Sequence, residues 1–183
     1  MQISYKLTKL DYLIYQLYIY ETNPKERKKR FFWRSLSVGI CLFAIFYISY
    51  TSSPTNGFIL FLVFILMLCF YPFYVKSSVK KQFKKYIQKY FINSINKEIT
   101  ASYKDNEICV SIQKNNSFNK FSAKDIKKIV KFGDMFYIFV GENTAIIVPN
   151  DSPNNLAFTT HIAKALNLGI SIENNDKLIR KYL

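Results

Sequence analysis

Residues 35–75 form an uncharged segment of 41 positions, although 21% of the chain is charged. A soluble domain rarely excludes charged side chains over so long a stretch, because its helices keep one face in water. Within the segment, residues 51–57 read TSSPTNG, a turn-forming sequence that divides it in two. We therefore predict two membrane-spanning helices, residues 31–50 and 58–75, joined by a loop at residues 51–57. The alternative is a soluble core that buries both helices.

Basic residues flank this predicted hairpin at both ends, and none lies between its two spans. Those before it are Lys25, Arg27, Lys28, Lys29, Arg30 and Arg34, and those after it are Lys76, Lys80, Lys81, Lys84, Lys85 and Lys89. Short segments rich in Lys and Arg stay on the cytoplasmic side of a membrane. The pattern predicts a multi-pass protein of the cell (plasma) membrane with both termini in the cytoplasm. Arg34 falls inside the first span and is expected to reach back to the interface.

The positive charge is unevenly distributed along the chain. The formal net charge is +14, and residues 1–99 carry 15 Lys and Arg against 4 acids, whereas residues 100–183 carry 11 against 8. This asymmetry around apolar spans indicates an anionic membrane surface, and no nucleic-acid partner is expected. Twelve residues are candidate contacts for anionic lipid: Arg27, Lys28, Lys29, Arg30, Lys80, Lys81, Lys84, Lys85, Lys124, Lys127, Lys128 and Lys131. The simpler interpretation is that they set the topology or are solvated surface residues.

The segments that adjoin the hairpin show strand and helix patterns. Residues 1–30 are predicted to form a cytoplasmic strand and helix, with alternating apolar residues at 3–7, a T-x-x-D capping sequence at Thr8, and a new helix after Asn23. Residues 76–96 place apolar side chains at three- and four-residue steps and lysines elsewhere, which predicts a basic amphipathic stalk helix. This helix either continues the second span and packs on the N-terminal helix, or lies along the lipid headgroups.

From residue 97 the pattern changes to short alternating runs separated by turn residues. Such a pattern predicts an antiparallel β meander. The predicted strands are residues 98–104, 107–114, 117–121, 126–132, 135–140 and 144–148. The segment 135–140 is apolar on both faces and is therefore expected to be a central strand.

A helix is predicted after the last of these strands. It covers residues 154–167, is capped by one residue of the Asp-Ser pair at 151–152, and ends at Gly169. Together with the meander it makes a domain of residues 97–169. Residues 170–183 are expected to be a weakly structured tail, with a last helical turn at 176–181.

Two segments resemble the YcxB-like family of small bacterial membrane proteins. They are ISYKLTKLDYLIYQ at residues 3–16 and EICVSIQKNNSFNKFSAKDIKKIVKFGDMFYIFVGENTAIIVPND at residues 107–151. Members of that family have an N-terminal strand and helix, a two-span hairpin and a cytoplasmic domain akin to pleckstrin-homology (PH) folds. The resemblance implies an α+β membrane protein: a two-helix transmembrane hairpin plus a small cytoplasmic PH-like antiparallel β domain with a C-terminal helix. It supplies no substrate and no catalytic residue.

The sequence shows no pattern of residues typical of an enzyme. His161 is the only histidine and lies in the predicted C-terminal helix, where an exposed or capping role is expected. The three cysteines have no metal-ligand spacing, and no glycine-rich loop suits a phosphate. We therefore expect no enzyme, no catalytic, metal-binding or cofactor-binding residue, and no cofactor.

Two hypotheses about function remain. The first is a membrane-anchored binding or scaffold module that faces the cytoplasm, with an anionic lipid or a membrane protein as its partner. The alternative is an accessory or immunity-like small membrane protein that acts through its hairpin on a transporter, channel or peptide. The small residues Ser35, Ser37, Gly39 and Ala44 give the first span a face suited to close helix contact, within the hairpin or with such a partner. The sequence indicates neither the ligand nor the oligomeric state.

Overall fold

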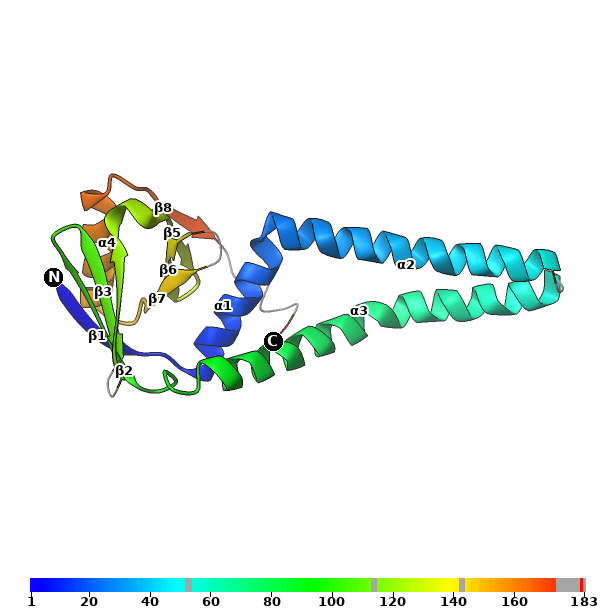
Figure 1. Cartoon of the computed structure of the whole chain (residues 1–183), viewed down its shortest axis with the longest axis horizontal. Helices are drawn as coiled ribbons and strands as arrows, with labels where there is room; N and C mark the ends of the chain where they lie inside the picture. Colours follow the sequence, from blue (N-terminus) through cyan, green and yellow to red (C-terminus); the bar gives the residue numbers. More distant parts are fainter. Residues whose placement is uncertain (52–53, 113–114, 142–143, 174–181, 183) are drawn as a thin grey trace. The chain divides into compact units, whose positions relative to one another are not determined.

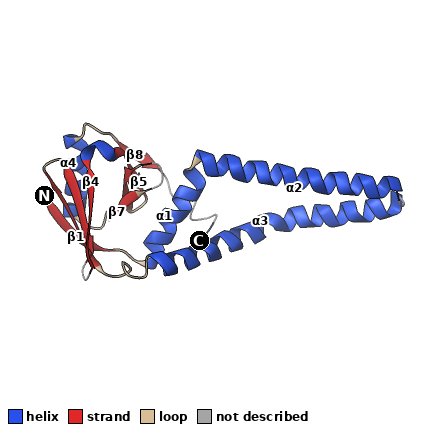
Figure 2. Cartoon of the chain, viewed as in Figure 1, coloured by secondary structure: helices blue, strands red, loops and turns tan. Residues whose placement is uncertain are grey.

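The computed structural model describes residues 1–51, 54–112, 115–141, 144–173 and 182. It divides into two compact units. The first unit comprises residues 1–17 and 83–181 with residue 183, and the second comprises residues 18–82 with Tyr182. The described strands all belong to the first unit, whereas the apolar parts of the two longest helices belong to the second (Figures 1 and 2).

Four α-helices are present in the described part of the chain. They are α1 (Lys9–Thr22), α2 (Pro24–Thr51), α3 (Pro54–Tyr90) and α4 (Pro153–Ala165), and a short 3₁₀ helix η1 (Ala123–Asp125) precedes the fifth strand. α3 is one continuous helix that contains Pro72. Because proline lacks an N–H group, this turn of α3 loses one backbone hydrogen bond.

The strands form two four-stranded sheets. The first has the order β1 (Gln2–Lys6), β2 (Glu98–Lys104), β3 (Glu107–Ile112) and β4 (Asn115–Ser122), and is antiparallel throughout. The second has the order β7 (Ala145–Pro149), β6 (Met135–Val140), β5 (Ile126–Phe132) and β8 (Ile170–Glu173). Here β8 runs parallel to β5, and the other pairs are antiparallel.

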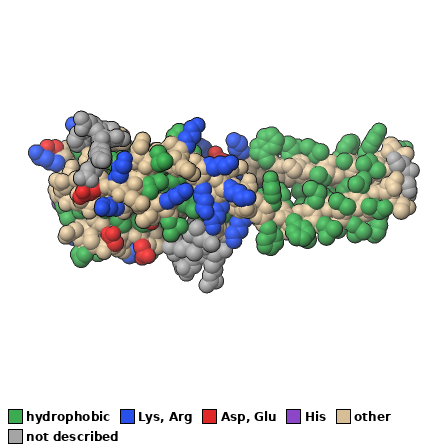
Figure 3. Space-filling model, turned by 90° about the horizontal axis from the view of Figure 1, so that it is seen from below, with side chains coloured by type: hydrophobic (Ala, Val, Ile, Leu, Met, Phe, Trp, Pro, Cys, Tyr) green, Lys and Arg blue, Asp and Glu red, His purple; other side chains and the backbone are tan. Residues whose placement is uncertain are grey.

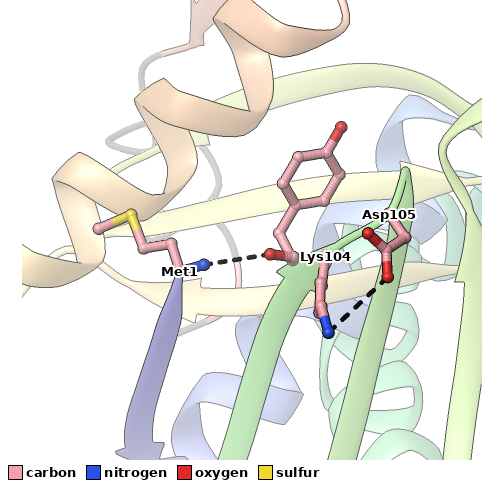
Figure 4. Close-up of polar contacts among 4 residues, drawn as sticks. Met1, Lys104 and Asp105 are labelled. Atoms are coloured by element: carbon pink, nitrogen blue, oxygen red, sulfur yellow. Dashed lines mark hydrogen bonds and ion pairs between the residues drawn. The ribbon is translucent and has the colours of Figure 1, made fainter.

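Strand β1 joins a sheet whose other strands lie far along the chain. Tyr5 pairs with Ile99 and Lys6 with Glu98. At the other end of β1 the Met1 ammonium donates to the Tyr103 carbonyl at 3.1 Å, and the Tyr103 N–H donates to the Met1 carbonyl at 2.9 Å (Figure 4). The β2–β3 turn follows directly, and Lys104 and Asp105 form an exposed ion pair of 3.9 Å there.

The core of the first unit lies between the sheets and helix α4. Its fully buried side chains include Ile108, Ile129 and Tyr137 from the strands and Phe158 and Ile162 from α4. α4 packs against β1 and β7. Strand β6 lies second in its sheet and has four buried residues in succession, so the predicted central strand is confirmed.

The residues that begin the helices are those that the sequence indicates. The Thr8 N–H donates to the Asp11 carboxylate at 2.7 Å, and the Asp11 N–H donates to the Thr8 hydroxyl at 3.3 Å, which is a reciprocal cap. Asn23 accepts from the Lys25 N–H at 2.9 Å at the start of α2. Ser152 caps α4, since its hydroxyl accepts from the Asn155 N–H at 3.3 Å.

The boundaries of the long helices differ from those predicted. Residues 51–57 were expected to be a loop, but α2 includes Thr51 and α3 already begins at Pro54. Proline is well suited to the first position of a helix, because the N–H that it lacks would have no partner there. The predicted stalk at residues 76–96 is part of α3, which ends at Tyr90.

The C-terminal prediction also needs correction. Residues 170–173 are not part of a weakly structured tail but form β8, whose backbone pairs with β5. α4 ends at Ala165, and the left-handed residue that follows its C-cap Leu166 is Asn167, with a φ of 53°, and not Gly169. The N–H groups of Asn167 and Leu168 donate to the carbonyls of Lys164 and Ala163, which is a Schellman motif. The helical turn predicted at 176–181 lies outside the described residues.

Candidate functional site

The long helices α2 and α3 expose their apolar side chains. Both are long and apolar enough to cross a membrane, and none of the residues in their most apolar windows is buried. Phe43 is 71% exposed in α2 and Phe70 is 69% exposed in α3. On the face seen in Figure 3, green side chains cover much of the part of the hairpin that lies beyond the Lys and Arg side chains. A soluble monomer rarely exposes an apolar surface of this extent, so another apolar medium or protein is needed to cover it.

The two helices approach each other closely at the end of the hairpin. Gly57 is buried, and a Cβ atom placed on it would lie 3.2 Å from the Cα atom of Ser49 and would overlap the Ser49 side chain. The Ser49 hydroxyl is turned back to the Ile45 carbonyl at 2.9 Å. By contrast, a Cβ atom on Gly39 would meet nothing within 4 Å. Gly57, which the sequence placed in a loop, is therefore the glycine that permits the helix contact.

A second contact between α2 and α3 lies at the other end of their apolar stretches. The Arg34 guanidinium lies over the Tyr71 ring, 5.3 Å from its centroid. One helical turn earlier, the Arg30 guanidinium lies 3.9 Å from the centroid of the Tyr20 ring and donates to the Tyr20 carbonyl. That carbonyl belongs to the last turn of α1, where a cation is favoured by the free carbonyl groups.

These four side chains form one cluster. Burial raises the pKa of the Tyr20 phenol, whereas the positive charges of Arg30 and Arg34 act to lower it and Tyr71 acts to raise it. In the described part of the chain, neither Arg30 nor Arg34 forms an ion pair with a carboxylate. We call Arg30, Arg34, Tyr20 and Tyr71 the arginine–tyrosine cluster.

A carboxylate and a C-terminal tyrosine lie beside this cluster. Tyr182 is 3% exposed, and its hydroxyl donates to the Glu21 carboxylate. The rings of Tyr182 and Tyr20 meet edge to face, with their centroids 6.5 Å apart. Burial is the largest cause, and the hydrogen bond to Glu21 the second, that raises the pKa of the Tyr182 phenol above its usual range. No pattern in the sequence predicts Tyr182 at this position.

The twelve predicted lipid contacts are divided between the two units. The second unit contains Arg27, Lys28, Lys29, Arg30, Lys80 and Lys81, and the first contains Lys84, Lys85, Lys124, Lys127, Lys128 and Lys131. All are exposed or half-buried. Each set of six thus lies on one unit.

Two of the lysines on β5 contact aromatic rings of the neighbouring strand. The Lys128 ammonium lies 4.6 Å from the centroid of the Phe139 ring, and that of Lys131 lies 5.8 Å from the Phe136 ring. Between Ile126 and Lys128 the register of β5 against β6 shifts, so Lys127 is an extra residue in a bulge. Covering β6 is therefore one role that the structure assigns to Lys128 and Lys131.

One segment of the first unit matches a family of known proteins. Residues 105–152 match the family model of YcxB-like proteins. This segment runs from the β2–β3 turn to the cap of α4. This segment is YcxB-like. The match confirms the resemblance at residues 107–151, whereas residues 3–16 lie outside the matched segment. No curated protein and no solved structure matches the chain.

The YcxB-like segment depends on residues outside it for its packing. Its strand β3 pairs with β2, which in turn pairs with β1, and Tyr15 of α1 reaches the start of β7. His161 is exposed and lies edge to face against Tyr103, with ring centroids 5.8 Å apart. Within the described residues, no three His, Cys, Asp or Glu side chains are grouped so that they can hold a metal ion.

Proposed function

We propose that this chain is an integral protein of the cell membrane in which helices α2 and α3 cross the bilayer as a hairpin and hold a non-enzymatic binding or scaffold module at the cytoplasmic face. The observation that carries the proposal is that both helices are apolar enough to span a membrane and bury none of their most apolar residues. A soluble core would bury them. Lipid covers such side chains without any protein partner.

The pairing of β1 with β2 supports an even number of crossings. Lys6 pairs with Glu98, and the Asn96 N–H donates to the Leu7 carbonyl at 2.9 Å, so the chain leaves the sheet and returns to it at neighbouring positions. Both strands must therefore lie on the same side of the membrane. Two crossing helices between them meet this requirement, and one does not. The basic flanks of both helices favour the cytoplasm as that side.

The first unit is the part that we propose binds a ligand. Strands β1–β4 and β5–β7 form two layers of antiparallel strands and are followed by α4, which supports a PH-like architecture with β8 as an addition. The YcxB-like match covers much of this unit. The sheet edges and the exposed lysines Lys124 and Lys127 are the surfaces it offers to a protein segment or to anionic lipid.

Labelling of single cysteines in intact cells tests the topology. In a chain with Cys41, Cys69 and Cys109 replaced by alanine, Thr55→Cys at the hairpin tip is expected to react with a membrane-impermeant maleimide from outside. Lys104→Cys at the end of β2 is expected to react only after the cells are opened. Both sites are exposed in the structure, so a lack of reaction reports the membrane and not burial.

Three results would overturn the proposal. Labelling of Lys104→Cys in intact cells would place the β unit outside the cell. A chain that stays in the supernatant as a monomer after centrifugation without detergent would show that α2 and α3 are not in lipid at all. Loss of protein from the membrane on extraction with high salt alone would likewise contradict a spanning hairpin, because salt weakens only surface charge contacts.

A further inference from the structure

Arg30 and Arg34 lie on one face of α2, and neither forms an ion pair with a carboxylate of the described residues. They are four residues apart, so their side chains are neighbours on the helix surface. Like charges at this spacing destabilise a helix slightly, and an anion that lies between them offsets the repulsion. Within the described residues neither arginine forms an ion pair with an acidic side chain, and the nearby Glu21 accepts from the Tyr182 hydroxyl.

The aromatic contacts hold both guanidinium groups in place. Arg30 is fixed by the ring and the carbonyl of Tyr20, and Arg34 is held against the ring of Tyr71 on the other helix. A guanidinium group has five N–H donors in a planar fork that suits the oxygens of a phosphate. Among the described contacts, Arg30 uses one hydrogen-bond donor of this set, and Arg34 lies over the Tyr71 ring. Within the described residues, most of these donors have no hydrogen-bond partner and can meet a ligand.

The position of the cluster along the hairpin suits a lipid headgroup. From Arg34 to the close contact at Ser49 is 15 residues of α2, or about 22 Å at about 1.5 Å per residue. The hydrocarbon core of a bilayer is about 30 Å thick. If the tip contact lies near one boundary of that core, Arg34 reaches the opposite boundary, where the lipid phosphates begin, by extending its side chain along the helix.

We propose that the arginine–tyrosine cluster binds the phosphate of an anionic phospholipid at the inner end of the hairpin. The inference rests on the proposed membrane function and goes beyond it, because it adds a lipid site in the second unit to the ligand-binding surfaces proposed for the first. Arg34 and Arg30 contact the phosphate oxygens, and Tyr71 and Tyr20 orient the two guanidinium groups. The exposed Arg27, Lys28 and Lys29 add attraction to the anionic surface without making the site.

Native mass spectrometry of the full chain in detergent tests the site. The first phosphatidylglycerol molecule is expected to bind more tightly than the first phosphatidylcholine molecule. Arg34→Gln should weaken phosphatidylglycerol binding by about fivefold, the equivalent of one interfacial cation. The affinity of Arg34→Lys for phosphatidylglycerol should lie between those of the wild-type chain and Arg34→Gln, because lysine keeps the charge but not the planar fork. Lys28→Gln is the matched control, since it removes the same charge from an exposed position on the same helix.

The possible outcomes separate the two proposals. If Arg34→Gln and Lys28→Gln weaken binding equally, or if neither does, the cluster is not a lipid site, whereas Thr55→Cys labelling can still show a membrane hairpin. If inorganic phosphate displaces phosphatidylglycerol from the chain, the site is one for small anions and the lipid assignment is wrong. If the wild-type chain is not inserted in membranes, the proposed function fails first. Circular dichroism of each variant confirms that the helices are retained.

Discussion

Replacing Tyr15 with phenylalanine removes one hydroxyl group that joins the N-terminal helix to the YcxB-like segment. Tyr15 is 6% exposed, its hydroxyl accepts from the Ala145 N–H at 2.9 Å, and its ring lies 5.3 Å from that of Tyr137. Tyr15→Phe keeps the ring contact but leaves the N–H at the start of β7 without this acceptor. The loss of one such hydrogen bond costs about 1–2 kcal/mol. Tyr15→Ala also removes the buried ring, for which about 3–5 kcal/mol is expected.

Hydrogen exchange followed by mass spectrometry measures both effects in the full chain in detergent micelles. Exchange in the peptide that contains Ala145 should accelerate by about 5–30-fold in Tyr15→Phe, which corresponds to 1–2 kcal/mol. Tyr15→Ala should accelerate exchange further and extend the effect to β6. Tyr90→Phe is the control, because Tyr90 is 58% exposed. Two results would refute the role of this contact. One is an exchange rate at Ala145 that is the same in Tyr15→Phe as in the wild-type chain. The other is an exchange rate in Tyr15→Ala that is no faster than in Tyr15→Phe.

Three further predictions concern the hairpin, the response to alkali and the end of α4. Gly57→Ala should lower the free energy of unfolding of the chain in micelles by about 1–3 kcal/mol through overpacking, which thermal denaturation measures. Gly39→Ala is the control and should not lower it, because a Cβ atom at residue 39 meets nothing within 4 Å. Burial raises the pKa of Tyr12 and of Tyr15 to about 12. An unfolded tyrosine titrates near about 10, so the stability from keeping these phenols neutral is complete below pH ~10 and is lost as the pH rises through ~12. A near-ultraviolet circular dichroism titration should show this loss, and a transition that is unchanged in the double phenylalanine variant would contradict it. Asn167→Val should destabilise the chain and Asn167→Gly should not, because residue 167 has a φ of 53°; equal melting temperatures would argue against this cap.

The local parts of the fold were predictable because they depend on neighbouring residues. Strands β2, β5 and β6 have the predicted bounds, since each is an alternating or apolar run between two turns. At the turn before β3, Asp105 and Asn106 both adopt positive φ, a conformation that these residue types tolerate. The strand β8 could not be found in this way. It has only four residues, two of them exposed, and its backbone pairing with β5 is what makes it a strand.

The candidate site was predictable in composition but not in geometry. Counting charges indicates a basic region before and after the hairpin, and helical periodicity places Arg30 and Arg34 on one face of α2. Neither shows which face meets α3, because the apolar residues of both spans continue around the helix. The position of Tyr182 beside Glu21 is a contact between residues 161 positions apart, which no local pattern indicates.

Two contacts fix how α2 and α3 are aligned, and the alignment has a consequence for the proposed lipid site. Ser49 meets Gly57, and Arg34 meets Tyr71, so the helices advance by 15 and 14 residues between the same two points. The pair is therefore antiparallel with almost no slip over about 21 Å. A shift of α3 by one turn would move Tyr71 by about 5.4 Å and leave Arg34 without its ring. Close packing at Gly57 thus positions a guanidinium group at the other end of the hairpin. We therefore expect a bulky residue in place of Gly57 to weaken phosphatidylglycerol binding, although residue 57 lies far from the proposed phosphate site.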